Sequence, residues 1–247
     1  MLQFQRPFEA FKAVGVSFND VQTTLGTMNQ GDALIIAREP DNPYDREAVR
    51  ILSLDGRPLG YVARTDTHHF TRRQVTGRIA SLGQAQQGSG LLGYRIECQP
   101  AIRCVALTAA PAPLLPWLDL AQRLQDGPGW DALLRRELAP GTRCHLSGAP
   151  ATHLVADWDI SDASRCMRLS AFLPATQAIA AIVTSPSLRI RALEALAALN
   201  YWGLEEAEIY HRAHMFQVAQ RGAEAAWTVD VELLRGLDLP VPEGLSV

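Results

Sequence analysis

The sequence predicts an α+β protein that begins with a small β-barrel and continues as a mostly α-helical domain with a small β-hairpin. In the first hundred or so residues, short runs rich in β-branched residues alternate with turn residues, which is typical of a small barrel. The second half carries apolar residues at three- and four-residue spacing, which is typical of helices. Prolines at every second or third position of residues 109–116 favour an extended linker. We therefore expect two domains, at residues 9–108 and 117–240.

The expected strands of the first domain are bounded by turn residues. In residues 48–54 the side chains at even positions alternate with Val49, Ile51 and Ser53, as they do in a strand. Asp55-Gly56 directly after them is a two-residue hairpin signal. The polar segment 65–73 is expected to form a helix. The strand-like runs are residues 12–18, 33–38, 48–54, 57–62, 75–82 and 91–107.

The second domain is expected to be built mainly from amphipathic helices. Asp131 and Glu205 suit the first turns of two of them, because the helix dipole favours acidic side chains there. Alternating patterns in residues 153–160 and 165–171 predict a hairpin between the second and third helices. The expected helices are residues 118–125, 130–138, 187–199 and 204–219.

The chain has a formal net charge of -3, but its two halves differ in charge. Residues 1–108 contain 12 Lys and Arg against 10 Asp and Glu, whereas residues 109–247 contain 11 against 16. The first half is therefore the better partner for a polyanion such as nucleic acid.

No run of about 18 apolar residues occurs, and the start Met-Leu-Gln-Phe-Gln-Arg lacks the basic and apolar regions of a signal peptide. We therefore expect a soluble, cytoplasmic protein without a membrane partner. The cysteines form no C-x-x-C pair, and in that compartment we expect them to be reduced and mostly buried. They are Cys98, Cys104, Cys144 and Cys166.

The most informative segment of the chain is residues 38–49. Pro40 and Pro43 each fix a φ angle, so the segment is expected to be a stiff loop that presents Asn42, Tyr44 and Asp45 outward. Asn supplies a donor and an acceptor, Tyr a stacking face, and Asp an acceptor that suits a sugar hydroxyl but repels phosphate. This combination favours the end of a nucleic-acid strand over its middle. The alternative is that these residues only form a well-capped turn.

The string Arg-Glu-Pro-x-Asn-Pro-Tyr-Asp-x-x-Ala-Val at residues 38–49 resembles the HIRAN domain, together with Gly60-Tyr61-Val62 after it and Val14-Gly15-Val16 before it. The resemblance covers residues 9–108 and implies an OB-like barrel that binds single-stranded DNA, in some members by capturing the 3′ end. It implies that Asp45 accepts the terminal hydroxyl, that Tyr44 stacks on a base, and that Tyr61 and Arg64 face phosphate. The candidate nucleic-acid-binding residues are Phe18, Asn19, Arg38, Asn42, Tyr44, Asp45, Tyr61, Arg64, Arg72 and Arg73.

Two features bear on this interpretation. DNA-end-binding relatives carry a basic residue and two aromatics where this chain has Ser17-Phe18-Asn19, so only one stacking face remains there. Arg64 also begins a basic patch with Arg72, Arg73 and Arg78, set against Asp66 alone; the alternative for this patch is a solvated helix face.

The second domain resembles, more weakly, HNH-like nucleases of the treble-clef type. The resemblance starts at Cys144, which alone keeps the identity of a zinc ligand. Ser147, Leu173 and Thr176 stand where thiolates are expected, and Val155-Ala156 replaces the His-Glu pair. The resemblance therefore implies a degenerate nuclease scaffold without metal or catalytic base.

Three functions follow as hypotheses. The first is a non-enzymatic protein, with no catalytic residues, metal or cofactor, that binds single-stranded DNA or DNA ends; its second domain is structural, or contacts a protein partner or another copy. The second is a metal-dependent nuclease with a rearranged site in the second domain. The third is a protein-protein interaction module. Candidate ligands for the second are His145, His153, Asp157, Asp159, His211 and His214.

Overall fold

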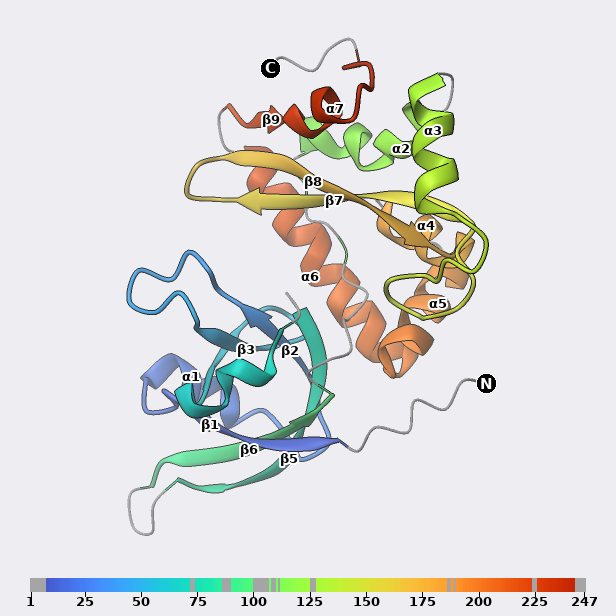
Figure 1. The fold of residues 1–247 in the computed structure, drawn as a ribbon. Coiled ribbons are helices and arrows are strands. Elements are labelled where there is room, and N and C mark those ends of the chain that lie inside the picture. Colours follow the sequence, from blue (N-terminus) through green and yellow to red (C-terminus); the bar gives the residue numbers. More distant parts are fainter. Residues whose placement is uncertain are drawn as a thin grey trace. The chain divides into compact units, whose positions relative to one another are not determined.

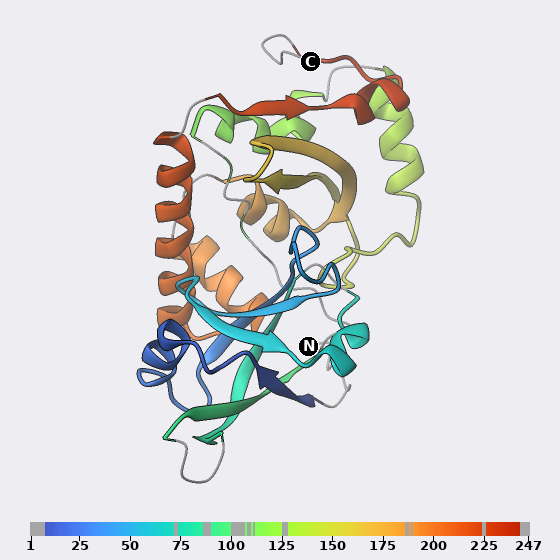
Figure 2. The same ribbon diagram turned by 90° about the vertical axis from the view of Figure 1, so that its left-hand side faces the viewer.

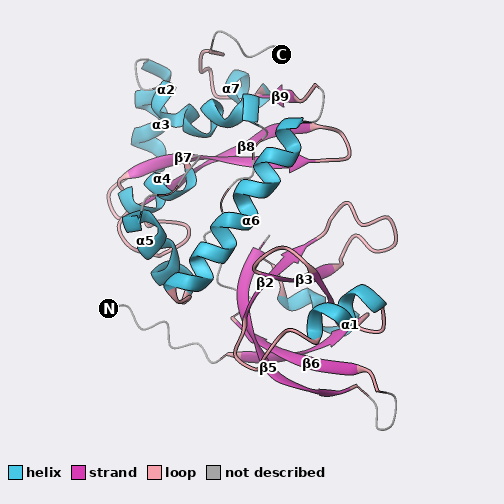
Figure 3. Ribbon diagram, turned by 180° about the vertical axis from the view of Figure 1, so that it is seen from behind, coloured by secondary structure: helices cyan, strands magenta, loops and turns pink. Residues whose placement is uncertain are grey.

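The structure is a computed structural model of the 247-residue chain. It describes residues 8–71, 74–85, 90–99, 107, 110, 112–124, 128–185, 188, 190–223 and 226–242. The chain divides into two units, one made of Met1–Cys104 with Asn200–Ala213 and the other of Val105–Leu199 with His214–Val247. Both helices and strands are present (Figures 1 and 3), so the predicted mixed α+β class is confirmed.

The first unit contains a closed antiparallel barrel with the strand order β1-β4-β3-β2-β5-β6. The predicted barrel is therefore confirmed. One helix, α1 (Asn19–Leu25), and one 3₁₀ helix, η1 (Arg64–His69), lie in its connections. The strands are β1 (Glu9–Val14), β2 (Ala33–Arg38), β3 (Val49–Ser53), β4 (Pro58–Val62), β5 (Gln74–Gln84) and β6 (Leu92–Cys98).

The first strand and the first helix differ from the sequence prediction. The strand expected over residues 12–18 ends at Val14, because Gly15 takes a positive φ of 69° and the chain then turns into α1. The polar segment expected as a helix over residues 65–73 forms the short η1 instead. At residues 12–18 a short apolar pattern did not distinguish a strand from a turn followed by a helix.

Alternate strand residues fill the core of the barrel. Leu34, Ile36 and Ile51 are buried, and Phe70 closes the core against Phe11 at a ring-centroid distance of 5.0 Å. The buried Tyr94 hydroxyl donates a hydrogen bond to a backbone carbonyl, so no polar group is left unpaired there. This packing fixes the connections that leave the barrel, including the β2–β3 loop that carries the motif of residues 38–49.

Residues 200–213 belong to the first unit, although the sequence analysis assigned them to the second domain. Trp202 Nε1 donates a hydrogen bond to Thr76 Oγ1 on β5 at 2.8 Å. Arg78, also on β5, pairs with Glu206 at 2.8 Å and donates to the carbonyl of Tyr201 at 2.7 Å. These contacts hold the start of α6 (Leu204–Ala223) on the barrel. They join residues more than 120 positions apart, which local patterns do not reveal.

We expect Glu206→Gln to lower the stability of the protein at neutral pH by roughly 1 kcal/mol and to flatten its decline in acid. Burial opposes ionisation of Glu206, but hydrogen bonds from Arg78 and the N–H of Gly203 outweigh it, so the pKa lies below its ordinary value of 4.5. A carboxyl with a lowered pKa contributes stability above its unfolded pKa, and this is lost as the pH falls through the folded pKa. Urea unfolding from neutral to acid pH measures the effect.

The control for this prediction is Glu205→Gln, which removes the neighbouring, exposed carboxylate. The free energy of unfolding of wild type and of Glu205→Gln should fall in parallel below about pH 4.5, while that of Glu206→Gln falls less. Parallel curves for all three proteins would contradict the role given to the Arg78–Glu206 pair.

The second unit contains a three-stranded sheet of order β7-β8-β9 and several helices. β7 (His153–Ser161) and β8 (Cys166–Ala175) form the predicted antiparallel hairpin, which is strongly curved in Figure 2 and has a bulge between Asp157 and Trp158. β9 (Thr228–Asp230) pairs with β8 in parallel. The helices are α2 (Leu120–Arg123), α3 (Pro128–Glu137), α4 (Gln177–Val183), α5 (Ile190–Asn200), the second half of α6, and α7 (Glu232–Gly236).

The extended linker expected over residues 109–116 differs from the structure in its second part, residues 112–116. These residues belong to the 3₁₀ helix η2 (Ala112–Asp119), because Leu114 and Leu118 are buried in the core of this unit. The same core contains Trp130, whose ring packs against that of Phe172 in a T-shaped arrangement with the centroids 5.4 Å apart. Burial of apolar side chains thus overrides the local preference of a proline-rich segment.

Three cysteines lie in described residues, and all are free thiols. Cys98 and Cys144 are buried and Cys166 is partly buried, while Cys104 lies outside the described residues. Burial raises the pKa of Cys98 to about 12, with a contribution from Glu9, so this thiol is a packing residue. Within the described part of the chain, no helix is long and apolar enough to cross a membrane.

Candidate nucleic-acid interface

The loop between β2 and β3 is held by the side chain of Asn42. Its Oδ1 accepts the N–H groups of Tyr44 at 3.0 Å and Asp45 at 3.1 Å, and its Nδ2 donates to Glu39 Oε2 at 2.7 Å. An Asn side chain that bonds the backbone two and three residues on is a local turn lock. The Tyr44 side chain projects from this locked turn with 95% of its surface exposed. The loop therefore offers a free aromatic ring on a backbone that is already ordered.

Glu39 connects this loop to the neighbouring strands. Its Oε2 also accepts a hydrogen bond from the Tyr61 hydroxyl on β4 at 3.2 Å, and its Oε1 pairs with Arg50 on β3 at 3.0 Å. Burial and the charge of Glu39 raise the pKa of Tyr61, so its hydroxyl stays protonated and remains a donor. Asn42, Arg50 and Tyr61 thus converge on one carboxylate.

Glu39 and Arg50 were not among the predicted site residues. Glu39 stands inside the 38–49 motif next to Pro40, and Arg50 occupies a position of β3 between buried neighbours. A carboxylate that is partly buried in a loop needs several donors. One donor, Asn42, lies in the same loop, but the other two, Arg50 and Tyr61, come from β3 and β4 and become apparent only in the fold.

Asp45 lies beside Arg64, the first residue of η1. One carboxylate oxygen of Asp45 accepts the N–H of Glu47 at 2.9 Å, and the other is 3.8 Å from Arg64 Nε. The Arg64 side chain is 88% exposed, so this ion pair adds little to stability. The pair places an acceptor and an exposed cation side by side, which suits a sugar hydroxyl and its neighbouring phosphate.

The other arginines of the predicted interface have different surroundings. Arg38 donates to the carbonyl of Phe70 at 2.7 Å and pairs with Glu47, so it braces the loop against the end of η1. Arg78 pairs with Glu206 at 2.8 Å, so its charge is already matched by a carboxylate. Arg72 and Arg73 lie outside the described residues. Of the predicted patch, the structure therefore describes only Arg64 as a well-exposed cation.

Phe18 and Asn19 lie on the connection from β1 to α1. Phe18 directly precedes α1 and is 64% exposed, and Asn19 is the first residue of the helix. The same connection contacts Tyr61, because a Cβ on Gly15 would lie 3.5 Å from the Tyr61 ring. Tyr61 thus lies between this connection and the β2–β3 loop.

In the part of the chain that the structure describes, no group of three or more His, Cys, Asp or Glu lies close enough to hold a metal ion. His145, His153, Asp157 and Asp159, the ligands considered for a rearranged nuclease site, therefore form no such group. Burial lowers the pKa of His211, and His214 is buried. Cys144 Sγ accepts the N–H of Ser147 at 3.5 Å.

Comparison with known proteins finds a family model that matches the part of the chain containing the β2–β3 loop. The model of the HIRAN domain matches residues 10–74, which hold β1 to β4, α1, η1 and the β2–β3 loop. The resemblance of the second half to HNH-like nucleases finds no support in the comparisons. A search of curated proteins gave no match.

Two solved structures are similar to part of the chain. A protein from Lactobacillus plantarum has 26% identity over 36% of this chain and 91% of its own, with a TM-score of 0.29. The HIRAN domain of human HLTF has 14% identity over 37% of this chain and 74% of its own, with a TM-score of 0.27.

Proposed function

We propose that the first unit is an OB-like barrel that binds single-stranded DNA at its 3′ end, without catalysis. The HIRAN domain matched by residues 10–74 is generally a DNA-binding module. The observation that carries the proposal is the locked β2–β3 loop, which presents the exposed ring of Tyr44 next to the Asp45–Arg64 pair.

Tyr44, Asp45 and Arg64 each suit one part of the 3′ end of a DNA strand. The Tyr44 ring stacks on the last base, because a base stacks on an aromatic face whatever its sequence. Asp45 accepts the 3′ hydroxyl through the oxygen that faces Arg64, and Arg64 binds the preceding phosphate. A 3′ phosphate would meet the Asp45 carboxylate, so the charge of this residue selects a free hydroxyl over a phosphorylated end.

The remaining candidates have supporting roles in this proposal. Arg38 and Asn42 hold the loop, Tyr61 supports it through Glu39, and Phe18 with Asn19 offers a second contact on the β1–α1 connection. Arg72 and Arg73 are proposed as further phosphate contacts. The second half, with 11 Lys and Arg against 16 Asp and Glu, adds no attraction for DNA. We assign it a structural or partner-binding role.

Asp45→Ala tests the proposal. We expect the wild type to bind a fluorescently labelled single strand with a free 3′ hydroxyl about tenfold more tightly than the same strand with a 3′ phosphate, and Asp45→Ala to lose that preference. Fluorescence anisotropy at fixed salt measures both affinities. Asp45→Asn, which keeps an oxygen for the N–H of Glu47, separates loss of charge from loss of the turn.

The matched control is Asp41→Ala, which removes an exposed carboxylate from the same loop. It should keep the preference for the free hydroxyl. If wild type, Asp41→Ala and Asp45→Ala all bind both strands equally well, the protein does not recognise 3′ ends, and binding that is absent in every case rejects the DNA-binding function itself.

A further inference from the structure

Two cations lie side by side on the outer face of the barrel. Lys12 on β1 and Arg95 on β6 are both exposed, and they stand directly opposite each other in the register of these strands. The residues before and after each of them in the sequence are buried in the barrel core, so the alternation of a strand points both cations outward. The two strands run next to each other in Figure 1.

Neither cation is matched by a carboxylate. Among the residues that the structure describes, Lys12 and Arg95 form no ion pair, and Arg95 Nη2 donates to the backbone carbonyl of Ala10 at 3.3 Å. Like charges directly opposite each other destabilise a pair of strands. An anion lying over both side chains removes this repulsion, so the pair indicates an anionic ligand.

The same outer face leads to the β2–β3 loop. The N–H of Ala63 donates to the carbonyl of Lys12 at 3.2 Å, and Ala63 directly precedes Arg64. Arg64, Lys12 and Arg95 therefore follow one another across η1, β1 and β6, and we call these three residues the basic strip. Glu97, two residues after Arg95 on the same face of β6, is partly buried and limits the strip on that side.

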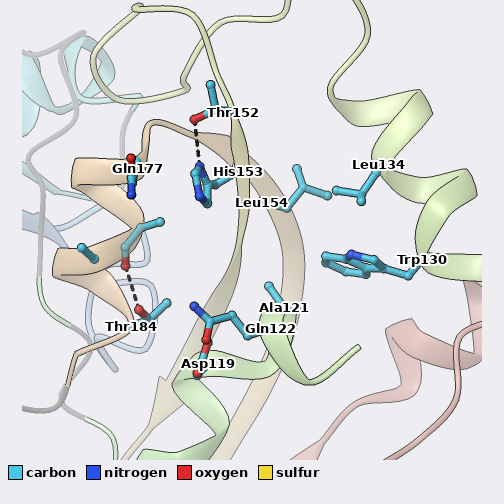
Figure 4. A pocket seen from close by; sticks show the side chains of 12 residues that line it. Asp119, Ala121, Gln122, Trp130, Leu134, Thr152, His153, Leu154, Gln177 and Thr184 are labelled. Atoms are coloured by element: carbon cyan, nitrogen blue, oxygen red, sulfur yellow. Dashed lines mark hydrogen bonds between the residues drawn. The ribbon is translucent and has the colours of Figure 1, made fainter. Parts of the chain in front are cut away.

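The cavity of the second unit offers no comparable site for an anion. It has a volume of about 520 Å³, and Asp119 and Gln122 lie on one side of it, opposite His153 and Gln177 (Figure 4). Among the described residues that line it, Asp119 is acidic and none is Lys or Arg. A phosphate there would meet a like charge, so the basic strip of the barrel is the better anion site.

We propose that the basic strip binds the phosphates that follow the captured 3′ end, an inference that rests on the proposed end-binding function. Arg64 binds the phosphate before the last nucleotide, and Lys12 and Arg95 bind the next ones. Neighbouring strands lie about 4.8 Å apart, and successive nucleotides rise about 3.4 Å along a DNA strand. Lys12 then lies at the second or third nucleotide. The DNA runs from its 3′ end at the loop over β1 to β6.

Lys12 is the only lysine of the chain, so a lysine crosslink reports where it meets the DNA. The probe is a single strand of about 20 nucleotides with one abasic site, whose aldehyde condenses with the Lys12 amine by loss of water. Cyanoborohydride reduces this imine to a stable amine, and peptide mapping separates it from a crosslink at the amino terminus. Lys12→Arg keeps the charge without this amine, so it should bind the DNA and give no such crosslink.

The yield of the crosslink should depend on its distance from the end. We expect at least about tenfold more crosslink when the abasic site is the third nucleotide from a free 3′ hydroxyl than when it is the fifteenth, because an anchored end concentrates nearby nucleotides at the strip.

Two variants that remove a charge test the affinity. Lys12→Gln and Arg95→Gln should each weaken binding about fivefold in about 0.1 M salt, and each lower the slope of log affinity against log salt by about 0.7. The matched control is Arg57→Gln, which removes an exposed arginine from the β3–β4 turn, at the end of these strands remote from the β2–β3 loop. It should change neither quantity. Circular dichroism confirms the fold of each variant.

Failure of this inference differs from failure of the proposed function. If wild type prefers a free 3′ hydroxyl but gives no Lys12 crosslink at either position, and both Gln variants bind like wild type, the strip is not the path of the DNA and end binding stands. If Lys12 crosslinks equally at both positions and a 3′ phosphate makes no difference, end recognition fails and the path from the 3′ end is overturned with it. A wild type that binds no DNA overturns both.

Discussion

Gly60→Ala is expected to destabilise the barrel by at least about 3 kcal/mol, through a strained backbone and a steric clash together. Gly60 has a φ of +116°, a region that side chains rarely adopt, and an added Cβ would lie 2.4 Å from the carbonyl oxygen of Val14. That oxygen belongs to β1, which pairs with β4 at this point, so it cannot move without breaking the barrel. Urea unfolding followed by circular dichroism measures the loss.

Two other glycines of the barrel separate the two causes. Gly83→Ala has open space and no unusual φ, so it should change stability by less than about 0.5 kcal/mol. Gly31→Ala also has open space but a φ of +93°, and should show the backbone cost alone, about 1 kcal/mol or more. If Gly60→Ala unfolds at the same urea concentration as Gly83→Ala, the close approach of β1 and β4 does not determine the stability of the barrel.

The same position matters for the candidate site. Gly60 precedes Tyr61, whose hydroxyl bonds Glu39 and whose ring lies against the β1–α1 connection. The Gly-Tyr-Val string is therefore explained by geometry: only glycine allows β4 to approach Val14 so closely, and this approach sets where Tyr61 supports the loop.

The barrel could be predicted because its signals are local. Alternation in residues 48–54 and the Asp55-Gly56 turn correspond to β3, β4 and the hairpin between them, where the N–H of Gly56 bonds the carbonyl of Ser53. The stiffness expected from Pro40, Pro43 and Asn42 is local as well, and it agrees with the Asn42 hydrogen bonds. Patterns of this kind depend on a few consecutive residues.

The features that sequence reasoning missed depend on distant partners. Glu39 and Arg50 became part of the site only because β3 and β4 bring Arg50 and Tyr61 to the loop. Residues 200–213 group with the first unit because the Arg78–Glu206 pair joins β5 to the start of α6, which are far apart in the sequence. The buried Oδ1 of Asp119 likewise depends on packing that no motif records.

Tyr44→Ala is expected to weaken single-stranded DNA binding about 10- to 100-fold, because stacking on an aromatic ring is worth about 1–3 kcal/mol per base. The ring is 95% exposed and makes no contribution to the core, so the midpoint of thermal unfolding should not change. Fluorescence anisotropy and thermal unfolding of the same preparation distinguish loss of binding from loss of fold. Tyr44→Phe, which keeps the stacking face, should bind nearly as well as wild type.

Tyr201→Ala is the matched control, since Tyr201 is also an exposed tyrosine of the first unit but lies outside the β2–β3 loop. It should leave DNA affinity unchanged. The contrast is informative because Ser17-Phe18-Asn19 offers only one further ring, and Tyr44 must then supply most of the stacking. If Tyr44→Ala binds as tightly as Tyr201→Ala, the locked loop does not contact DNA, and the exposed ring then marks a surface for another protein, which was the third hypothesis from the sequence.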